Sequence, residues 1–161
     1  TRHFLDSVQV IDFIDKNDKS LIDVGSGAGF PGLVIALALK DRKIPLKVKL
    51  IEKSPKKIKF LKELIKELHL DAQVVNQNIL ENPKKIVGDV FVARAFKPLK
   101  IILPLIHNYL ENWKKFFIFL GKTGRNELHQ ASKSWDIEYK QRVSITSDDS
   151  IVIEINRLKK K

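Results

Sequence analysis

Residues 21–32 read Leu-Ile-Asp-Val-Gly-Ser-Gly-Ala-Gly-Phe-Pro-Gly, and this stretch decides the fold of the chain. An apolar run ends in three alternating glycines, Gly25, Gly27 and Gly29, and a helical pattern follows directly. Glycines let backbone N–H groups and a helix N-terminus approach a ligand closely, because they carry no side chain. A strand, a glycine-rich turn and a helix in this order are typical of a nucleotide-binding loop. The stretch therefore predicts a site for an adenosine-type cofactor.

On both sides of this loop, strand patterns alternate with helix patterns. Buried strands are predicted at 20–24, 46–52, 72–76, 89–93 and 116–120, and helices at 3–15, 32–39, 54–68, 99–112 and 125–133. Segments 137–145 and 150–157 alternate apolar and polar residues, which predicts an antiparallel edge; 77–87 predicts a loop or short helix, and 159–161 a solvated lysine tail. This order favours a Rossmann-like α/β fold, mostly parallel, with an antiparallel C-terminal edge and helices on both faces.

Several polar residues and the glycine loop follow directly on predicted strands. They are the loop at Gly25, Glu52, the segment 77–80, Arg94 and Lys122. In open α/β sheets the ligand binds beyond the carboxyl ends of the strands, at the point where the strand order reverses. We therefore expect these residues to share one edge of the sheet and to form one site.

The composition excludes several classes of function. The 161 residues predict a single domain over 1–161, and a chain that begins at Thr1 leads us to expect a missing N-terminal helical segment. Thirty Lys and Arg against nineteen Asp and Glu give a net charge of +11, which suits nucleic acid but also fits a lysine-rich coding bias. Without cysteine there is no disulfide framework or cysteine nucleophile. With no secretory signal or long apolar run, we expect a cytoplasmic monomer that contacts no membrane and no metal.

Two cofactors compete for the glycine loop. Gly27, Gly29 and Gly32 satisfy the dinucleotide pattern G-x-G-x-x-G, and Glu52 lies at the spacing of a ribose-binding acid. Asp23, two residues before the first glycine, favours S-adenosylmethionine instead, because its carboxylate complements an ammonium group and would repel a pyrophosphate. In that interpretation Glu52 accepts hydrogen bonds from both ribose hydroxyls.

Taken together, four stretches resemble the RsmG (GidB) family, the bacterial guanine-N7 methyltransferases of small-subunit ribosomal RNA. The resemblance covers essentially the whole chain, and the Pro-Gly ending of the glycine loop is more specific than the glycines. The matching stretches are Thr-Arg-His-Phe-Leu-Asp-Ser at 1–7, the loop at 23–32, Ala-Arg-Ala-Phe at 93–96 and Lys-Thr-Gly-Arg at 122–125.

The resemblance implies a class I S-adenosylmethionine-dependent methyltransferase that modifies guanine N7 in the 530 loop of 16S rRNA, with the 30S subunit as its partner. It implies cofactor contacts by Asp23, Gly25, Gly27, Phe30, Glu52, Ile79, Leu80 and Arg94. Arg94 would lie beside the transferring methyl group and act by position and charge. No general base is needed, because N7 already carries a lone pair. RNA contacts are expected from Arg2, His3, Lys122 and Arg125.

Two departures from the family pattern leave alternatives open. Where the family has R-x-E, this chain has Asn78-Ile79-Leu80, with Glu81 one place late, so backbone groups of Ile79 and Leu80 would have to contact adenine. Thr123 also interrupts the K-G-R motif. The alternatives are an RNA-binding protein with a degenerate cofactor loop and an NAD-dependent oxidoreductase.

Overall fold

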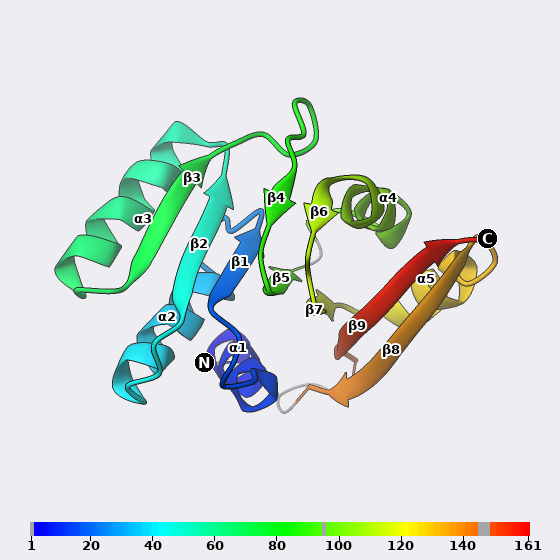
Figure 1. Cartoon of the computed structure of the whole chain (residues 1–161), viewed down its shortest axis with the longest axis horizontal. Coiled ribbons are helices and arrows are strands. Elements are labelled where there is room, and N and C mark those ends of the chain that lie inside the picture. Colours follow the sequence, from blue (N-terminus) through cyan, green and yellow to red (C-terminus); the bar gives the residue numbers. More distant parts are fainter. Residues whose placement is uncertain (1, 95, 145–148) are drawn as a thin grey trace.

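The computed structural model describes residues 2–94, 96–144 and 149–161 and has a seven-stranded sheet at its centre (Figure 1). The strands of this sheet are β1 (Ser20–Val24), β2 (Lys47–Glu52), β3 (Ala72–Asn76), β5 (Val90–Arg94), β7 (Lys115–Leu120), β8 (Trp135–Val143) and β9 (Ile151–Lys160). The helices are α1 (Arg2–Gln9), the 3-10 helix η1 (Val10–Phe13), α2 (Gly32–Asp41), α3 (Pro55–Glu67), α4 (Leu99–Tyr109) and α5 (Gly124–Ala131). None of the described helices has the length and apolar character that crossing a membrane requires.

The strand order is β3-β2-β1-β5-β7-β9-β8. The first five strands in this order run parallel, whereas β9 pairs antiparallel with both β7 and β8, so the predicted mostly parallel sheet with an antiparallel C-terminal edge is confirmed. From β1 the chain moves outward through β2 to β3 and then returns to the other side of β1 through β5 and β7. The order therefore reverses between β1 and β5, where such sheets bind their ligands.

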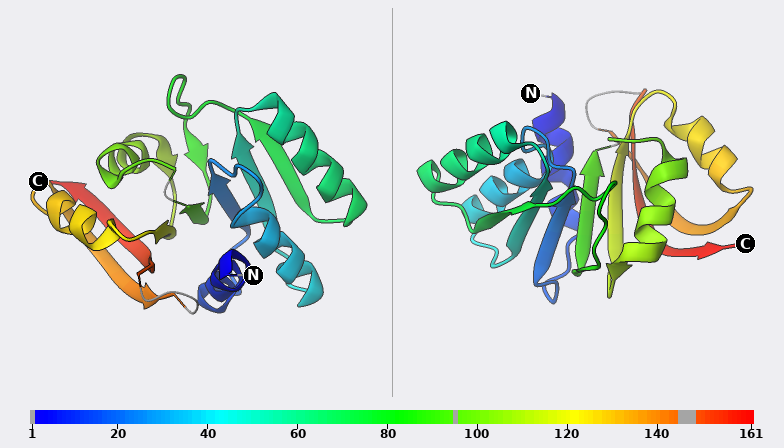
Figure 2. Two further views of the ribbon diagram at one scale, coloured as in Figure 1. Left: turned by 180° about the vertical axis from the view of Figure 1, so that it is seen from behind. Right: turned by 90° about the horizontal axis from the view of Figure 1, so that it is seen from above.

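Helices cover both faces of the sheet, as the alternating pattern predicts (Figures 1 and 2). On one face, α2 and η1 bury Leu33, Ile35 and Ile11 against β1 and β2. On the other face, α4 buries Ile102 and Leu103 against β5, β7 and β9. Each central strand serves both cores, because successive side chains of a strand point to opposite faces.

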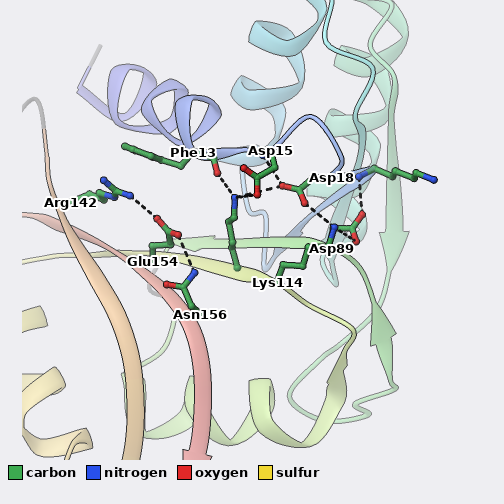
Figure 3. Close-up of polar contacts among 10 residues, drawn as sticks. Phe13, Asp15, Asp18, Asp89, Lys114, Arg142, Glu154 and Asn156 are labelled. Atoms are coloured by element: carbon green, nitrogen blue, oxygen red, sulfur yellow. Dashed lines mark hydrogen bonds and ion pairs between the residues drawn. The ribbon is translucent and has the colours of Figure 1, made fainter.

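The amino ends of the central strands are held by a network of charged groups (Figure 3). Asp18, whose side chain is fully buried, accepts a hydrogen bond from the Asp15 N–H at 2.9 Å and pairs with Lys114 Nζ at 3.2 Å. Lys115 Nζ donates to the Phe13 carbonyl at 2.6 Å and to Asp15 at 2.9 Å. The segment before β1 is thereby tied to the start of β7. Asp89, which directly precedes β5, also accepts a hydrogen bond from the Lys19 N–H at 2.8 Å, so the start of β5 belongs to the same network.

Three segments differ from their sequence predictions. The expected helix at 3–15 changes to a 3-10 helix at Val10, and the expected loop at 77–87 contains strand β4 (Ile86–Val87), which pairs parallel with β6 (Leu110–Glu111). The predicted lysine tail is part of β9 up to Lys160, although its side chains are exposed. For β4 and β9, pairing with a distant segment decides the backbone, and the local sequence pattern does not reveal that partner.

Candidate functional site

The glycine loop between β1 and α2 has a left-handed backbone that glycine adopts readily. Gly25, Gly27 and Gly29 have φ angles of +73°, +58° and +98°, values that residues with a side chain rarely adopt. A Cβ atom at Gly25 would also lie 3.2 Å from the ring of Phe96. Gly25 and Gly27 line cavities beside the loop, so their backbone is available for close contact with a ligand, whereas Gly29 is buried against Leu33.

Asp23 lies beneath this loop and is fully buried. Its Oδ2 accepts a hydrogen bond from the Gly32 N–H at 2.8 Å, which anchors the start of α2. Burial raises the pKa of this carboxyl to about 7, against the lowering effect of the Gly32 N–H, Ser26 and Arg94. The contact that the structure describes is therefore with the protein backbone, and the contact with a cofactor ammonium group stays a prediction.

Glu52 connects the end of β2 to the glycine loop. Its Oε2 accepts a hydrogen bond from the Gly27 N–H at 2.7 Å, and its Oε1 accepts from the N–H groups of Lys53 and Ser54, both at 2.9 Å. A carboxylate can accept about four hydrogen bonds, so these three leave room for a further donor. Glu52 is thus held rigidly at the wall of a cavity, where its predicted contact with ribose hydroxyls is untested.

Two cavities flank the glycine loop. The first has a volume of about 310 Å³ and contains Glu52, Ile79 and Leu80 among its lining residues. The second has a volume of about 300 Å³ and is lined by Gly25, Ser26, Gly27, Ala28, Phe30, Arg94 and Phe96. Gly25, Gly27 and Phe96 line both, so the two cavities adjoin across the loop. Together they have the size of a small-molecule site.

The far wall of the first cavity is formed by the segment after β3. Ile79 is buried, and Asn78 Oδ1 accepts hydrogen bonds from the N–H groups of Leu80 and Glu81, both at 3.2 Å. The Leu80 N–H is therefore engaged by Asn78 in this conformation. Of the two backbone groups predicted to contact adenine, that of Leu80 would have to exchange this weak bond for the ligand.

Arg94, at the end of β5, is the cation of the second cavity. Its Cζ lies 5.6 Å from the centre of the Phe119 ring, and the carboxylates of Asp6 and Asp23 interact with it electrostatically. Burial lowers the pKa of Arg94, whereas Asp6 and Asp23 raise it. The ordinary pKa of an arginine lies far above neutral, so the guanidinium stays charged at neutral pH.

Asp6 and Phe96 belong to the site, although neither is among the predicted cofactor contacts. The Ser144 hydroxyl lies 3.0 and 2.9 Å from the two carboxylate oxygens of Asp6, which links α1 to the segment after β8. For Asp6 a signal existed, since it belongs to the Thr1–Ser7 motif. Ser144 is 138 residues away from Asp6 and has no local signal. Phe96 packs against the core on the α4 face of the sheet and lines both cavities.

The predicted RNA-binding residues occupy the surroundings of the site. Lys122 is exposed and lies 3.7 Å from Asp149, and Arg125 is exposed on the first turn of α5. Arg2 and His3 are in α1, but their side chains lie outside the described part of the structure. Thr123, which interrupts the expected motif, donates a hydrogen bond to Glu127 at 2.8 Å, and Glu127 in turn accepts from the Leu99 N–H at the start of α4.

Other places in the molecule are less suited to an adenosine-type ligand. A cavity of about 570 Å³ lies between α4 and α5, but it contains none of the glycine-loop residues. Among the described residues, no group of three His, Asp or Glu side chains is placed to hold a metal ion. The loop cavities are therefore the candidate site.

Comparison with known proteins gives the same family across the whole chain. The family model described as rRNA small subunit methyltransferase G matches residues 1–152. A protein from Pelagibacter ubique named ribosomal RNA small subunit methyltransferase G is 41% identical over 160 residues, which cover 99% of this chain and 75% of the relative. A Rickettsia felis protein of the same name is 35% identical over 159 residues, covering 99% of this chain and 79% of the relative.

Solved structures share the fold at low sequence identity. The chain superimposes on the 16S rRNA methylase RmtB with a TM-score of 0.68 at 16% identity, covering 97% of this chain and 64% of that one. It superimposes on TrmK from M. capricolum, solved with S-adenosyl-homocysteine, with a TM-score of 0.64 at 18% identity, covering 93% of this chain and 66% of that one. These likenesses assign the class I S-adenosylmethionine-dependent methyltransferase fold to this chain.

Proposed function

We propose that this chain, which belongs to the rRNA small subunit methyltransferase G family, transfers a methyl group from S-adenosylmethionine to N7 of a guanine in the 530 loop of 16S rRNA. The observation that carries the proposal is the pair of adjoining cavities at the carboxyl edge of the sheet. One contains the Glu52 carboxylate and the other contains the Arg94 guanidinium. An adenosine joined to a charged amino acid is a ligand of matching shape and polarity.

The residues present fit this cofactor. The first cavity offers a carboxylate with remaining acceptor capacity for ribose hydroxyls and the apolar Ile79 and Leu80 for adenine. Between the cavities, left-handed glycines leave the loop backbone uncovered, and Phe30, 38% exposed, forms an apolar wall on the far side. Asp23 lies directly beneath the glycine loop, and its carboxyl group would attract the ammonium group of a cofactor bound on the other side of that loop.

S-adenosylmethionine, when bound, would supply a methyl group that is carried on a positively charged sulfur. Guanine N7 would form a bond to the methyl carbon through its ring-plane lone pair, while the bond between that carbon and the sulfur breaks. The positive charge passes from sulfur to the guanine ring, and no proton has to leave N7. The protein therefore needs no general base, and its contribution is position and electrostatics.

We expect Arg94 to position the guanine base in the second cavity. A guanidinium presents several donors in a fixed plane and binds guanine O6 well, which leaves N7 free when the contact is to O6 alone. Asp6 and Asp23 act on Arg94 from within the protein, and the Ser144 hydroxyl holds Asp6. The two carboxyls favour the charged guanidinium at the end of β5, beside the second cavity.

The proposed partner is the RNA of the 30S subunit. The net charge of +11 favours association with a polyanion. Lys122 and Arg125 follow β7 at the same edge as Arg94, and Arg2 and His3 come from α1, which also supplies Asp6. We place the reaction in the cytoplasm, where small subunits are assembled, and expect a single copy of the chain to carry it out.

One observation favours an alternative. The engagement of the Leu80 N–H by Asn78, together with the missing R-x-E pattern, would suit an RNA-binding protein whose cofactor loop has degenerated. Calorimetry with S-adenosylhomocysteine distinguishes the two functions. We expect micromolar binding, whereas absence of binding up to millimolar ligand would favour the alternative. NAD serves in the same experiment as the probe for an oxidoreductase.

The direct test measures incorporation of labelled methyl groups into 30S subunits and into free small-subunit rRNA. Mass spectrometry of nuclease fragments then identifies the modified base. We expect N7-methylguanosine at a single position, and its loss from rRNA of a strain in which the gene is deleted. Normal N7-methylguanosine in the deletion strain would refute the proposed function.

A further inference from the structure

One side of α3, beside strand β3, carries a stripe of three lysines, Lys59, Lys62 and Lys66. Their spacing of three and four residues places them on one side of the helix. All three are exposed, and within the described residues no ion pair engages any of them. They line a groove of about 440 Å³ between α3 and the sheet, together with Pro55, Ile58, Glu63 and Asn76.

This lysine groove opens beside the cofactor site. Asn76 is the last residue of β3 and lines the groove, and the next residue, Gln77, lines the first cavity. Lys53 and Lys57, which flank the start of α3, line that cavity as well. A ligand lying in the groove would therefore reach the carboxyl edge of the sheet, where Arg94 is located.

Three lysines on other parts of the described structure are neutralised by the protein itself. Lys114 and Lys115 pair with Asp15 and Asp18, and Lys85 pairs with Glu111. In the groove, three lysines face solvent with Glu63 as the only carboxylate in its lining. Like charges held together repel one another, and a polyanion removes this repulsion and releases its own counterions.

The dimensions of the stripe fit a nucleic-acid strand. Seven residues separate Lys59 from Lys66, which corresponds to about 10 Å along the helix axis. Even in a DNA duplex, phosphates of one strand follow one another at about 3.4 Å along the axis, so a stripe of this length can face more than one phosphate of a single strand. A small anion would engage one lysine at a time, whereas an extended backbone engages all three.

We propose that the lysine groove of α3 binds the phosphate backbone of the rRNA substrate and holds RNA flanking the target base. This inference rests on the proposed function for the identity of the RNA. The groove is separate from Lys122 and Arg125, which lie on the other side of the site after β7. The RNA would thus be held on both sides of the reacting base.

The test compares two triple variants of equal charge. The groove variant is Lys59→Ala, Lys62→Ala and Lys66→Ala, and the control variant is Lys140→Ala, Lys159→Ala and Lys160→Ala at the opposite edge of the sheet. Binding of in vitro transcribed small-subunit rRNA is measured between 50 and 200 mM salt, with methylation kinetics and S-adenosylhomocysteine affinity in parallel. For the groove variant we expect KM for RNA to rise about tenfold, with kcat and S-adenosylhomocysteine affinity within about twofold.

The salt dependence gives a second readout. Each lost phosphate contact lowers the slope of log affinity against log salt by about 0.7 to 0.9, so the groove variant should lose about 2 to 3 in slope and the control almost nothing. Equal effects of the two variants would show that only the net charge of the protein matters, and this would overturn the inference. Unchanged RNA binding by the groove variant would overturn it as well. Either result leaves methylation by the wild-type protein intact. A wild-type protein that fails to methylate the RNA refutes the proposed function instead.

Discussion

The two edges of the central sheet are built from the same kinds of residue for opposite purposes. At the amino edge, Asp15, Asp18 and Asp89 meet Lys114 and Lys115 in a network in which each charged side chain has a partner of opposite charge (Figure 3). At the carboxyl edge, bare glycine backbone, the Glu52 carboxylate and the Arg94 guanidinium border cavities. The comparison indicates that charged side chains paired with one another stabilise the fold, whereas charged side chains that line a cavity are available to bind a ligand.

The strongest test of this comparison is Arg94→Ala at the carboxyl edge. We expect kcat/KM for methylation to fall at least about 100-fold, because one preorganised donor at a reacting centre contributes that much. The thermal midpoint should change little, since Arg94 is only half buried. Methyl incorporation and a thermal melt of the same preparation measure both. Near-normal turnover would show that Arg94 has no role beside the reacting base.

The opposite edge should give the opposite result. Asp18→Ala removes a fully buried carboxylate that accepts the Asp15 N–H and pairs with Lys114, so we expect a loss of about 2–3 kcal/mol in the free energy of unfolding. Activity per folded molecule should stay within about twofold of wild type. Denaturant unfolding measures the loss.

A control for Asp18 is available in Asp12. Asp12→Ala removes an exposed carboxylate, 64% accessible, whose bond to Arg42 at 3.0 Å lies in solvent. We expect this change to lower the free energy of unfolding by less than about 1 kcal/mol. Equal losses for the two variants would mean that the amino-edge network does not stabilise the frame.

The two edges should also respond to pH with opposite sign. Burial raises the pKa of Asp23 to about 7, so the folded state binds its proton more tightly than the unfolded state does. Its contribution to stability is full below about pH 4 and is lost as pH rises to about 7. The free energy of unfolding of Asp23→Asn, relative to that of wild type, should therefore increase by about 2–3 kcal/mol from pH 5 to pH 8. Urea unfolding of both proteins at each pH measures this change.

Asp89 is the matched residue at the amino edge. The Lys19 N–H and Lys114 lower the pKa of Asp89, so its contribution is present at neutral pH and is lost as pH falls through the lowered pKa. Asp89→Asn should cost more stability at pH 7 than in acid. The same pH trend in both variants would contradict the assigned environments of the two carboxyls.

The smallest effect is expected at Lys122, which is 83% exposed and only 3.7 Å from an exposed Asp149. Lys122→Ala should change stability by less than about 0.5 kcal/mol, because solvent and salt screen such pairs. If Lys122 contacts RNA, KM for rRNA should rise about two- to threefold at low salt and approach wild type at high salt. A KM unchanged at low salt would remove Lys122 from the proposed interface.

Most strands and helices are predictable from the sequence, because a buried face requires apolar residues at the regular spacing of a strand or a helix. The strands around Val24 and Phe117, the glycine loop and the start of α3 at Pro55 all follow from apolar spacing or from local backbone constraints. Pairing between distant segments is not predictable in this way. Strand β4 forms because β6 lies beside it, and the C-terminal lysines extend β9 because β8 offers a partner.

The candidate site divides along the same line. The sequence alone determined that a glycine loop follows β1 and that Glu52 and Arg94 end parallel strands, because turn chemistry and strand period are local properties. Only the tertiary structure decided that Asp23 points beneath the loop to Gly32, that Asn78 engages the Leu80 N–H, and that Asp6 reaches the Arg94 region with Ser144. These are directions of side chains within a packed protein, and packing among distant segments is what fixes them.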